Sequence, residues 1–215
     1  MKLYLSSYNL GDKAEVLKDW IKTSKDNKIA LIPNAGDFST REIRDEYVKK
    51  HIALLNGVGF DTSVVDLQDY FGKEKELVKE LQKYHAYFAN GGNCFNLRQA
   101  MKLSGFDKYL LTLKDKDNYL YGGWSAGVCV LAKSMKGIEL CDDPTSNPYN
   151  HPPIYEGIGL LDYLICPHYK SDHKETKMID DVVAYMQKNN LLYKTLRDGE
   201  VIIQDTKTKE TQIEF

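Results

Sequence analysis

The sequence has no long hydrophobic run and no strong excess of either charge. No apolar stretch approaches the roughly 18 residues of a membrane-spanning helix, so a membrane is not expected as a partner. The 29 basic and 31 acidic side chains of the 215 residues nearly cancel, and this balance excludes the basic surface typical of nucleic-acid binding. The start of the chain also lacks the apolar core of a signal peptide, which predicts a soluble, cytoplasmic protein.

Cysteine is scarce, and recognisable metal-binding spacings are missing. No C-x-x-C pair occurs, and in a reducing compartment the cysteines are expected to be free thiols. His168 and His173 with Asp172 form neither H-E-x-x-H nor a set with a third ligand at a recognised spacing. We therefore expect no metal and no other cofactor. The four cysteines are Cys94, Cys129, Cys141 and Cys166.

No Pro/Gly/Ser-rich linker divides the chain, so a single domain over residues 1–215 is predicted. Short apolar runs alternate with longer amphipathic stretches, which is typical of βα units around a mostly parallel sheet. The sequence therefore predicts a three-layer α/β/α sandwich. Strands are expected at 2–6, 28–33, 62–67, 85–89, 118–123 and 163–166. Helices are expected at 12–24, 40–56, 73–83, 93–104, 126–134 and 173–188.

The C-terminal segment has a different pattern. Brief strand-like runs at 191–193, 200–203 and 211–213 are separated by turn residues, which predicts antiparallel strands at the sheet edge. An exposed edge could pair with a second copy of the chain, so both a monomer and a homodimer remain open.

The pattern Gly123-x-Ser125-x-Gly127 follows a predicted strand and precedes a predicted helix. This is the setting of a nucleophile elbow, in which small residues allow a sharp turn and the serine hydroxyl projects from the backbone. The same pattern also fits a tight turn with a capping serine. Ser125 is the candidate nucleophile, and the amide of Ala126 is a candidate oxyanion donor.

A second glycine motif ends the strand at 85–89, where Gly91, Gly92 and Asn93 follow. Paired glycines at the carboxyl end of a strand let the backbone approach a ligand closely. Open α/β sheets place their sites at that edge. We therefore expect the Gly92 amide to complete the oxyanion hole, with Gly91 and Asn93 beside the substrate.

His168 is the candidate base, because it follows the strand at 163–166 and is expected at the same edge. Histidine suits this role near neutral pH. His173 is expected on the surface at a helix entry. The acid that orients the imidazole stays open among the residues between Ser125 and His168, with Asp142 slightly ahead. The four candidates are Glu139, Asp142, Asp143 and Glu156.

Two thiols could rival the serine. Cys129 lies one helical turn after Ser125 and is expected to be buried within the helix. Cys94 follows the second glycine motif more directly but has no obvious base. Neither displaces Ser125 as the candidate nucleophile.

The two glycine motifs at 88–93 and 123–127, the segment at 32–36 and the His168 segment at 167–169 together resemble the peptidase E group of serine peptidases, which includes the cyanophycinases. The resemblance covers about residues 1 to 190 and implies a fold like that of class I glutamine amidotransferases. It also implies Ser125 as nucleophile, His168 as base and the Gly92 and Ala126 amides as oxyanion hole. The matching segments are Ile32-Pro33-Asn34-Ala35-Gly36, Phe88-Ala89-Asn90-Gly91-Gly92-Asn93, Gly123-Trp124-Ser125-Ala126-Gly127 and Pro167-His168-Tyr169.

The resemblance implies hydrolysis of short peptides, with dipeptides of the type Asp-X as the family substrate. An aspartyl carboxylate requires a cation in the pocket, for which Arg98 and Lys170 are candidates. Two other functions remain open. One is a non-catalytic binding or regulatory module that kept the elbow, and the other is a related amide or isopeptide hydrolase of the cyanophycinase kind.

Overall fold

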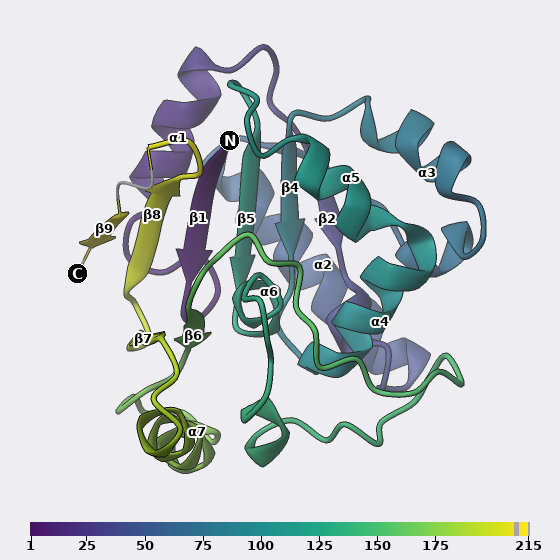
Figure 1. Ribbon diagram of the computed structural model, residues 1–215. Helices are drawn as coiled ribbons and strands as arrows, with labels where there is room; N and C mark the ends of the chain where they lie inside the picture. Colours follow the sequence, from purple (N-terminus) through teal and green to yellow (C-terminus); the bar gives the residue numbers. More distant parts are fainter. Residues whose placement is uncertain (209–210, 215) are drawn as a thin grey trace.

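The computed structural model describes residues 1–208 and 211–214 and is built around a seven-stranded sheet (Figure 1). The strand order is β3-β2-β4-β5-β1-β8-β9. Strands β1 to β5 pair in parallel, whereas β8 runs antiparallel to β1, and β9 antiparallel to β8. The strands are β1 (Lys2–Ser6), β2 (Lys28–Ile32), β3 (Asp61–Val64), β4 (Ala86–Ala89), β5 (Leu120–Trp124), β8 (Val201–Asp205) and β9 (Thr211–Glu214).

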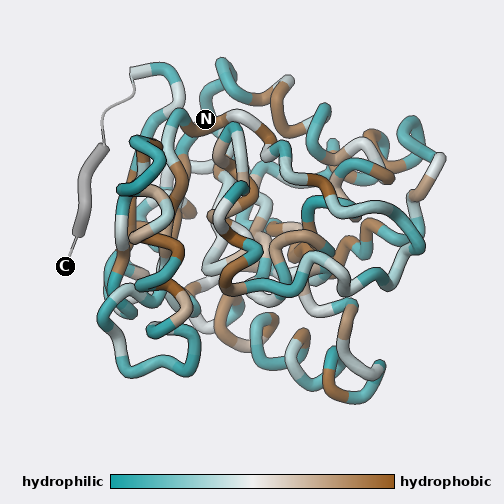
Figure 2. The backbone as a smooth tube through the Cα atoms, turned by 60° about the horizontal axis from the view of Figure 1, so that its bottom comes forward, coloured by the Kyte–Doolittle hydropathy of each residue, from teal (hydrophilic) through white to brown (hydrophobic). Residues whose placement is uncertain are grey.

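Helices cover both faces of the sheet and make the predicted three layers. Successive strand residues point to opposite faces, so Tyr4 packs in the cluster beneath α1 and α2, while Leu3 and Leu5 pack beneath the helices of the other face. Hydrophobic positions follow the strands in Figure 2, and hydrophilic ones the outer surfaces of the helices. The helices are α1 (Ala14–Thr23), α2 (Arg41–Val58), α3 (Glu74–Leu81), α4 (Cys94–Ser104), α5 (Phe106–Thr112), α6 (Ala126–Cys129) and α7 (Thr176–Lys188).

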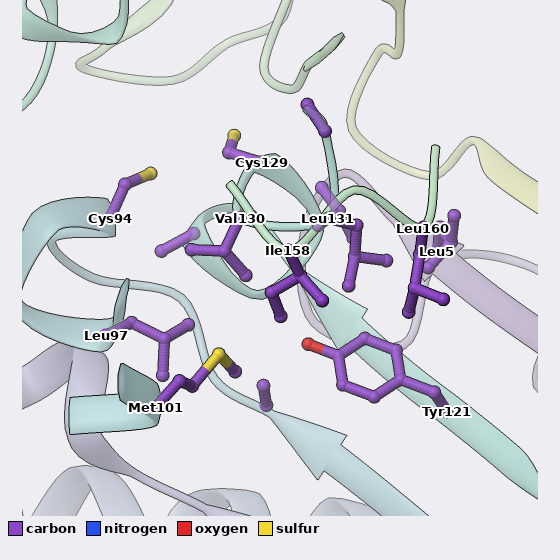
Figure 3. Close-up of a cluster of buried hydrophobic side chains, with 14 of the residues drawn as sticks. Leu5, Cys94, Leu97, Met101, Tyr121, Cys129, Val130, Leu131, Ile158 and Leu160 are labelled. Atoms are coloured by element: carbon purple, nitrogen blue, oxygen red, sulfur yellow. The ribbon is translucent and has the colours of Figure 1, made fainter. Parts of the chain in front are cut away.

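A close-packed cluster beneath α6 fixes the end of β5 (Figure 3). Tyr121, from β5, is fully buried, and its hydroxyl donates to the carbonyl oxygen of Gly127 at 2.7 Å. Leu5 and Val130 belong to the same buried cluster. A satisfied hydroxyl inside a packed core resists displacement. The turn between β5 and α6 is therefore held from below.

Two sequence predictions about this part of the chain were wrong. Strand β6 (Leu164–Cys166) is not part of the main sheet, and 191–193 is not part of the antiparallel edge. Instead β6 pairs in parallel with β7 (Tyr193–Thr195) in a separate two-stranded sheet. The partner position beside β1 is taken by β8. Residues 209–210, which lie between the predicted edge strands at 200–203 and 211–213, are outside the described residues.

The helix expected over 126–134 is also shorter, since α6 ends at Cys129. The chain then turns and pairs through isolated bridges with the segment that precedes β6. The Ile158 amide donates to the carbonyl oxygen of Val130 at 2.8 Å, and Ala132 bridges to Leu161. Tertiary pairing thus overrides the helical pattern. Among the described residues, no helix has both the length and the apolar character of a membrane span.

Candidate active site

Ser125 occupies a strained turn between β5 and α6. Its φ is +49° and its ψ −114°, a conformation that a residue with a side chain adopts only when its surroundings enforce it. The flanking glycines allow the turn. A Cβ on Gly127 would lie 2.3 Å from the carbonyl oxygen of Ala89, and one on Gly123 would lie 2.9 Å from that of Gly127. The Gly-x-Ser-x-Gly pattern is therefore required by close backbone packing, as expected of a nucleophile elbow.

The second glycine turn lies between β4 and α4. Gly92 has a φ of +137°, and a Cβ there would lie 2.3 Å from the carbonyl oxygen of Ala35. The next residue, Asn93, caps α4 by accepting a hydrogen bond from the Asn96 amide at 3.0 Å. Its own amide donates to the carbonyl oxygen of Ala35 at 2.8 Å. Asn93 thus fixes the turn that presents Gly91 and Gly92.

The structure brings the two turns to one cavity of about 660 Å³, which Gly91, Gly92, Asn93 and Ser125 all line. Within the described part of the chain, the amides of Gly92 and Ala126 have no hydrogen-bond acceptor. Ala126 follows Ser125 directly and begins α6. A free amide on the residue after the serine, together with a second free amide from a turn at the same cavity, provides the kind of donors that an oxyanion hole needs.

His168 lies in the turn after β6 and lines the same cavity. Its φ is +60°, and the residue is 1% exposed. The main chain is held on both sides, because the His168 amide donates to Ser7 Oγ at 2.8 Å and its carbonyl oxygen accepts from Thr176 Oγ1 at 2.8 Å. The Nε2 atom has no partner among the residues described. This nitrogen is free to accept a proton.

The acid beside His168 is Asp198, which the sequence did not single out. Asp198 Oδ1 lies 2.7 Å from His168 Nδ1 and also accepts from Ser7 Oγ at 2.8 Å. The pairing of β6 with β7 explains this contact. Cys166 is in register with Thr195, so residues just beyond the two parallel strands meet at the same end. Asp198 therefore fixes the tautomer in which Nδ1 carries the proton.

Asp142 was expected to orient the imidazole, and the structure corrects this. Asp142 lines the cavity, but its carboxylate accepts from the Cys94 amide at 2.7 Å. It is thus bound to the start of α4 and does not hold His168. The other three candidates have partners other than His168. Asp143 accepts a hydrogen bond from the Thr145 amide, and Glu139 accepts one from the Gly137 amide. Glu156 forms an isolated β-bridge with Ser134.

The buried position of His168 changes its acidity. Burial lowers the pKa of His168 below the ordinary 6.5, and the nearby Asp198 carboxylate opposes this shift. Burial is the larger effect, so the imidazole is neutral at neutral pH, as a general base must be. Burial likewise raises the pKa of the Asp142 carboxyl to about 6.

His173 was expected on the surface, but it lines the cavity and stacks on His168. The two rings are 3.8 Å apart and 11° from parallel. Ligand atoms of His168, His173 and Glu175 lie within 4.8 Å of one another. Metal ligands need lone pairs that converge on one point, whereas the lone pairs of stacked rings run side by side. This geometry does not suit a metal ion.

The remaining candidates lie apart from the cavity. Arg98 is buried and forms an ion pair with Asp107 at 3.0 Å. Lys170 is exposed and lies over the ring of Tyr169. Cys94 and Cys129 are buried in the core (Figure 3). The hydrogen bond with Cys129, and after it burial, raises the pKa of the Cys94 thiol. A thiol in such surroundings is a poor nucleophile.

Comparison with known proteins identifies the family. The model of peptidase family S51 matches residues 4–211, so the chain belongs to this family. An uncharacterized peptidase of Listeria monocytogenes is 27% identical over 170 residues, which cover 79% of this chain and 78% of the relative. Peptidase E of Streptomyces coelicolor is 29% identical over 126 residues, which cover 55% of this chain and 48% of that protein. Family membership makes the protein a peptidase.

Solved structures show the same fold. A crystal structure described as that of a putative peptidase E protein from Listeria monocytogenes superposes with a TM-score of 0.79 at 23% identity, covering 99% of this chain and 97% of the other. A peptidase from an acI-B1 actinobacterium superposes with a TM-score of 0.74 at 16% identity, covering 99% and 86% of the respective chains. The α/β architecture with its mostly parallel sheet is therefore that of peptidase E-type proteins.

Proposed function

We propose that the protein is a serine peptidase that cleaves short peptides through an acyl-enzyme on Ser125. The observation that carries the proposal is the arrangement around one cavity, where the strained Ser125 turn meets a His168–Asp198 pair. The same three roles recur on unrelated folds, and they are recognised by geometry.

The reaction follows from these groups. Ser125 Oγ attacks the peptide carbonyl carbon while His168 Nε2 takes the hydroxyl proton. The Gly92 and Ala126 amides stabilise the oxyanion, and Asp198 stabilises the imidazolium. When the C–N bond breaks, the leaving amine takes the proton from His168. Water then attacks the ester carbonyl carbon and gives one proton to His168. When the C–O bond breaks, Ser125 Oγ takes that proton back from His168, which restores the hydroxyl and the neutral imidazole.

The cavity supports a small substrate. A volume of about 660 Å³ is typical of sites for small molecules and suits a short peptide better than a folded protein. A β-linked or isopeptide substrate would use the same acyl transfer, so hydrolysis of the cyanophycinase kind is the alternative reaction for this site. The Asp-X preference implied by the resemblance stays a prediction.

Labelling with a fluorophosphonate tests the proposal without a known substrate. We expect one adduct on Ser125, located by mass spectrometry, and none in Ser125→Ala. His168→Ala should label at least a hundredfold more slowly, because the base is lost. Cys94→Ser is the matched control and should label at the wild-type rate. Absence of an adduct on Ser125 in the folded wild-type protein would favour the non-catalytic module instead.

A further inference from the structure

Positively and negatively charged side chains both line the cavity, and they differ in whether another group of the protein already pairs with them. Its basic side chains other than histidine are Arg44 and Lys174, and its carboxylates are Asp142, Asp143 and Glu175. A group already paired within the protein adds little to ligand recognition, whereas an unpaired one must find its partner in water or in the substrate. The availability of each group therefore indicates which charge the cavity selects.

Arg44 is already paired. Its Nη2 lies 2.6 Å from Asp66 Oδ2, and its Nε donates to Asp37 Oδ1. Two carboxylates thus surround one guanidinium. Lys174 has an 83% exposed side chain and is solvated. Among the described residues, no buried cation of this cavity is left to bind a substrate carboxylate.

Glu175 has the opposite character. Its side chain is 24% exposed, and the nearest cation, Lys174 Nζ, is 3.8 Å from Oε1, beyond a hydrogen bond. Its other oxygen, Oε2, lies 4.0 Å from His168 Nε2, also beyond a hydrogen bond. In the described part of the chain, no donor forms a hydrogen bond with this carboxylate. A partly buried carboxylate on the cavity wall, without a hydrogen-bond donor of its own, is available to bind a cation that enters the cavity.

We infer that Glu175 binds the ammonium group of the substrate residue that acylates Ser125. This inference rests on the proposed function. The geometry is compatible, because standard bond lengths place an α-ammonium nitrogen about 2.5 Å from the carbonyl carbon of the same residue. The carbonyl carbon must lie beside Ser125 and His168, and Glu175 is close to the nitrogen of His168 that takes the proton. A lysine side chain offers the same ammonium chemistry from further away.

Binding of an ammonium group by Glu175 also determines which side chains the acylating residue of the substrate can carry. A carboxylate on the acylating residue would lie near Glu175 and be repelled by it. Among the described residues, the lysine of the cavity, Lys174, is exposed and solvated, so it offsets this repulsion little. Neutral or basic acylating residues are therefore preferred over aspartate. This preference is opposite in sign to the one that the family resemblance implies.

Four p-nitroanilide substrates separate the sources of the ammonium group. Alanine anilide carries only the α-ammonium, N-acetyl-lysine anilide only the side-chain ammonium, N-acetyl-alanine anilide neither, and aspartate anilide adds a carboxylate. The variant is Glu175→Gln. Its control is Asp172→Asn, which removes the same charge from an exposed residue of the same loop that does not line the cavity.

For the wild-type protein we expect the N-acetyl-alanine and aspartate anilides to be the poorest substrates. Glu175→Gln should raise KM by about tenfold or more for either alanine anilide or N-acetyl-lysine anilide, because the charge-assisted hydrogen bonds to the ammonium group are lost. It should change kcat less than about threefold and leave N-acetyl-alanine anilide unaffected. A higher KM for alanine anilide would show that Glu175 binds the α-ammonium group, and a higher KM for N-acetyl-lysine anilide would show that it binds the side-chain ammonium group. Asp172→Asn should change none of these values.

Equal losses for all four substrates would overturn the inference, because Glu175 would then act only through His168. A preference for aspartate anilide in the wild-type protein would overturn it as well. Failure of the proposed function is a separate result, in which no substrate is cleaved and Ser125 takes no fluorophosphonate.

Discussion

Asp198 is the residue whose removal most directly tests the site. Its Oδ1 accepts from both His168 Nδ1 at 2.7 Å and Ser7 Oγ at 2.8 Å. Asp198→Ala removes the acceptor and the charge together, so the imidazole loses its fixed tautomer and the imidazolium its counter-ion. In serine peptidases such a loss lowers the rate by roughly 10⁴-fold.

Asp198→Asn divides this loss into its two causes. Because His168 Nδ1 and Ser7 Oγ both donate to Oδ1, they favour the orientation of the asparagine in which its amide oxygen replaces Oδ1. The His168 tautomer with the proton on Nδ1 is then kept, while the negative charge is lost. A hydrogen bond to a charged group exceeds a neutral one by about 1 to 2 kcal/mol, which corresponds to about five- to thirtyfold in rate. Asp198→Asn should therefore be much more active than Asp198→Ala.

The rate of fluorophosphonate labelling at Ser125 measures these effects, and thermal unfolding verifies that each variant is folded. Asp142→Asn is the control, because its amide oxygen can still accept from the Cys94 amide. We expect its labelling rate within about threefold of the wild type. If Asp142→Asn were as slow as Asp198→Ala, or Asp198→Ala as fast as the wild type, the assignment of the acid would be refuted.

Two further predictions concern pH and backbone packing. Because burial lowers the pKa of His168, the acidic limb of kcat/KM should have its midpoint below pH 6.5. An acidic limb of kcat/KM with its midpoint above pH 7 would contradict this reasoning. The free energy of unfolding should also decline as pH falls below 6.5, because the His168 imidazole of the unfolded chain binds its proton before that of the folded chain. Gly92→Ala should lower stability by about 2 kcal/mol or more in thermal unfolding, because its Cβ would lie 2.3 Å from the Ala35 carbonyl oxygen at a φ of +137°. Gly57→Ala, in a helix with open space around the new Cβ, should instead be neutral or stabilising.

The sequence predicted the parts of the site that depend on local patterns. The positions of the strands in the parallel part of the main sheet follow from alternating βα units, and the positions of Ser125 and Gly92 follow from glycine motifs at strand ends. These signals are contained within a few residues. Their location at one sheet edge then follows from parallel pairing alone.

The acid was missed because it depends on a distant pairing. Strands β6 and β7 contain three residues each, too few to show a periodic pattern. Their partnership brings together residues 30 positions apart in the chain. Asp198 also stands before Gly199 in what looks like an ordinary turn. The available signal was that Asp198 follows one short strand as His168 follows another.

The two proposed catalytic side chains share one backbone property. Ser125 and His168 both have positive φ values, +49° and +60°, although neither is glycine. Each such residue costs of order 1 to 3 kcal/mol, and the cost persists only where the surroundings enforce the conformation. At Ser125 the enforcing contacts are the glycine packing and the buried Tyr121 hydroxyl beneath α6. At His168 they are the hydrogen bonds of its amide and carbonyl groups. Both turns are thus held by groups that take no part in the chemistry, and these groups determine how accurately the serine and the base face the same cavity.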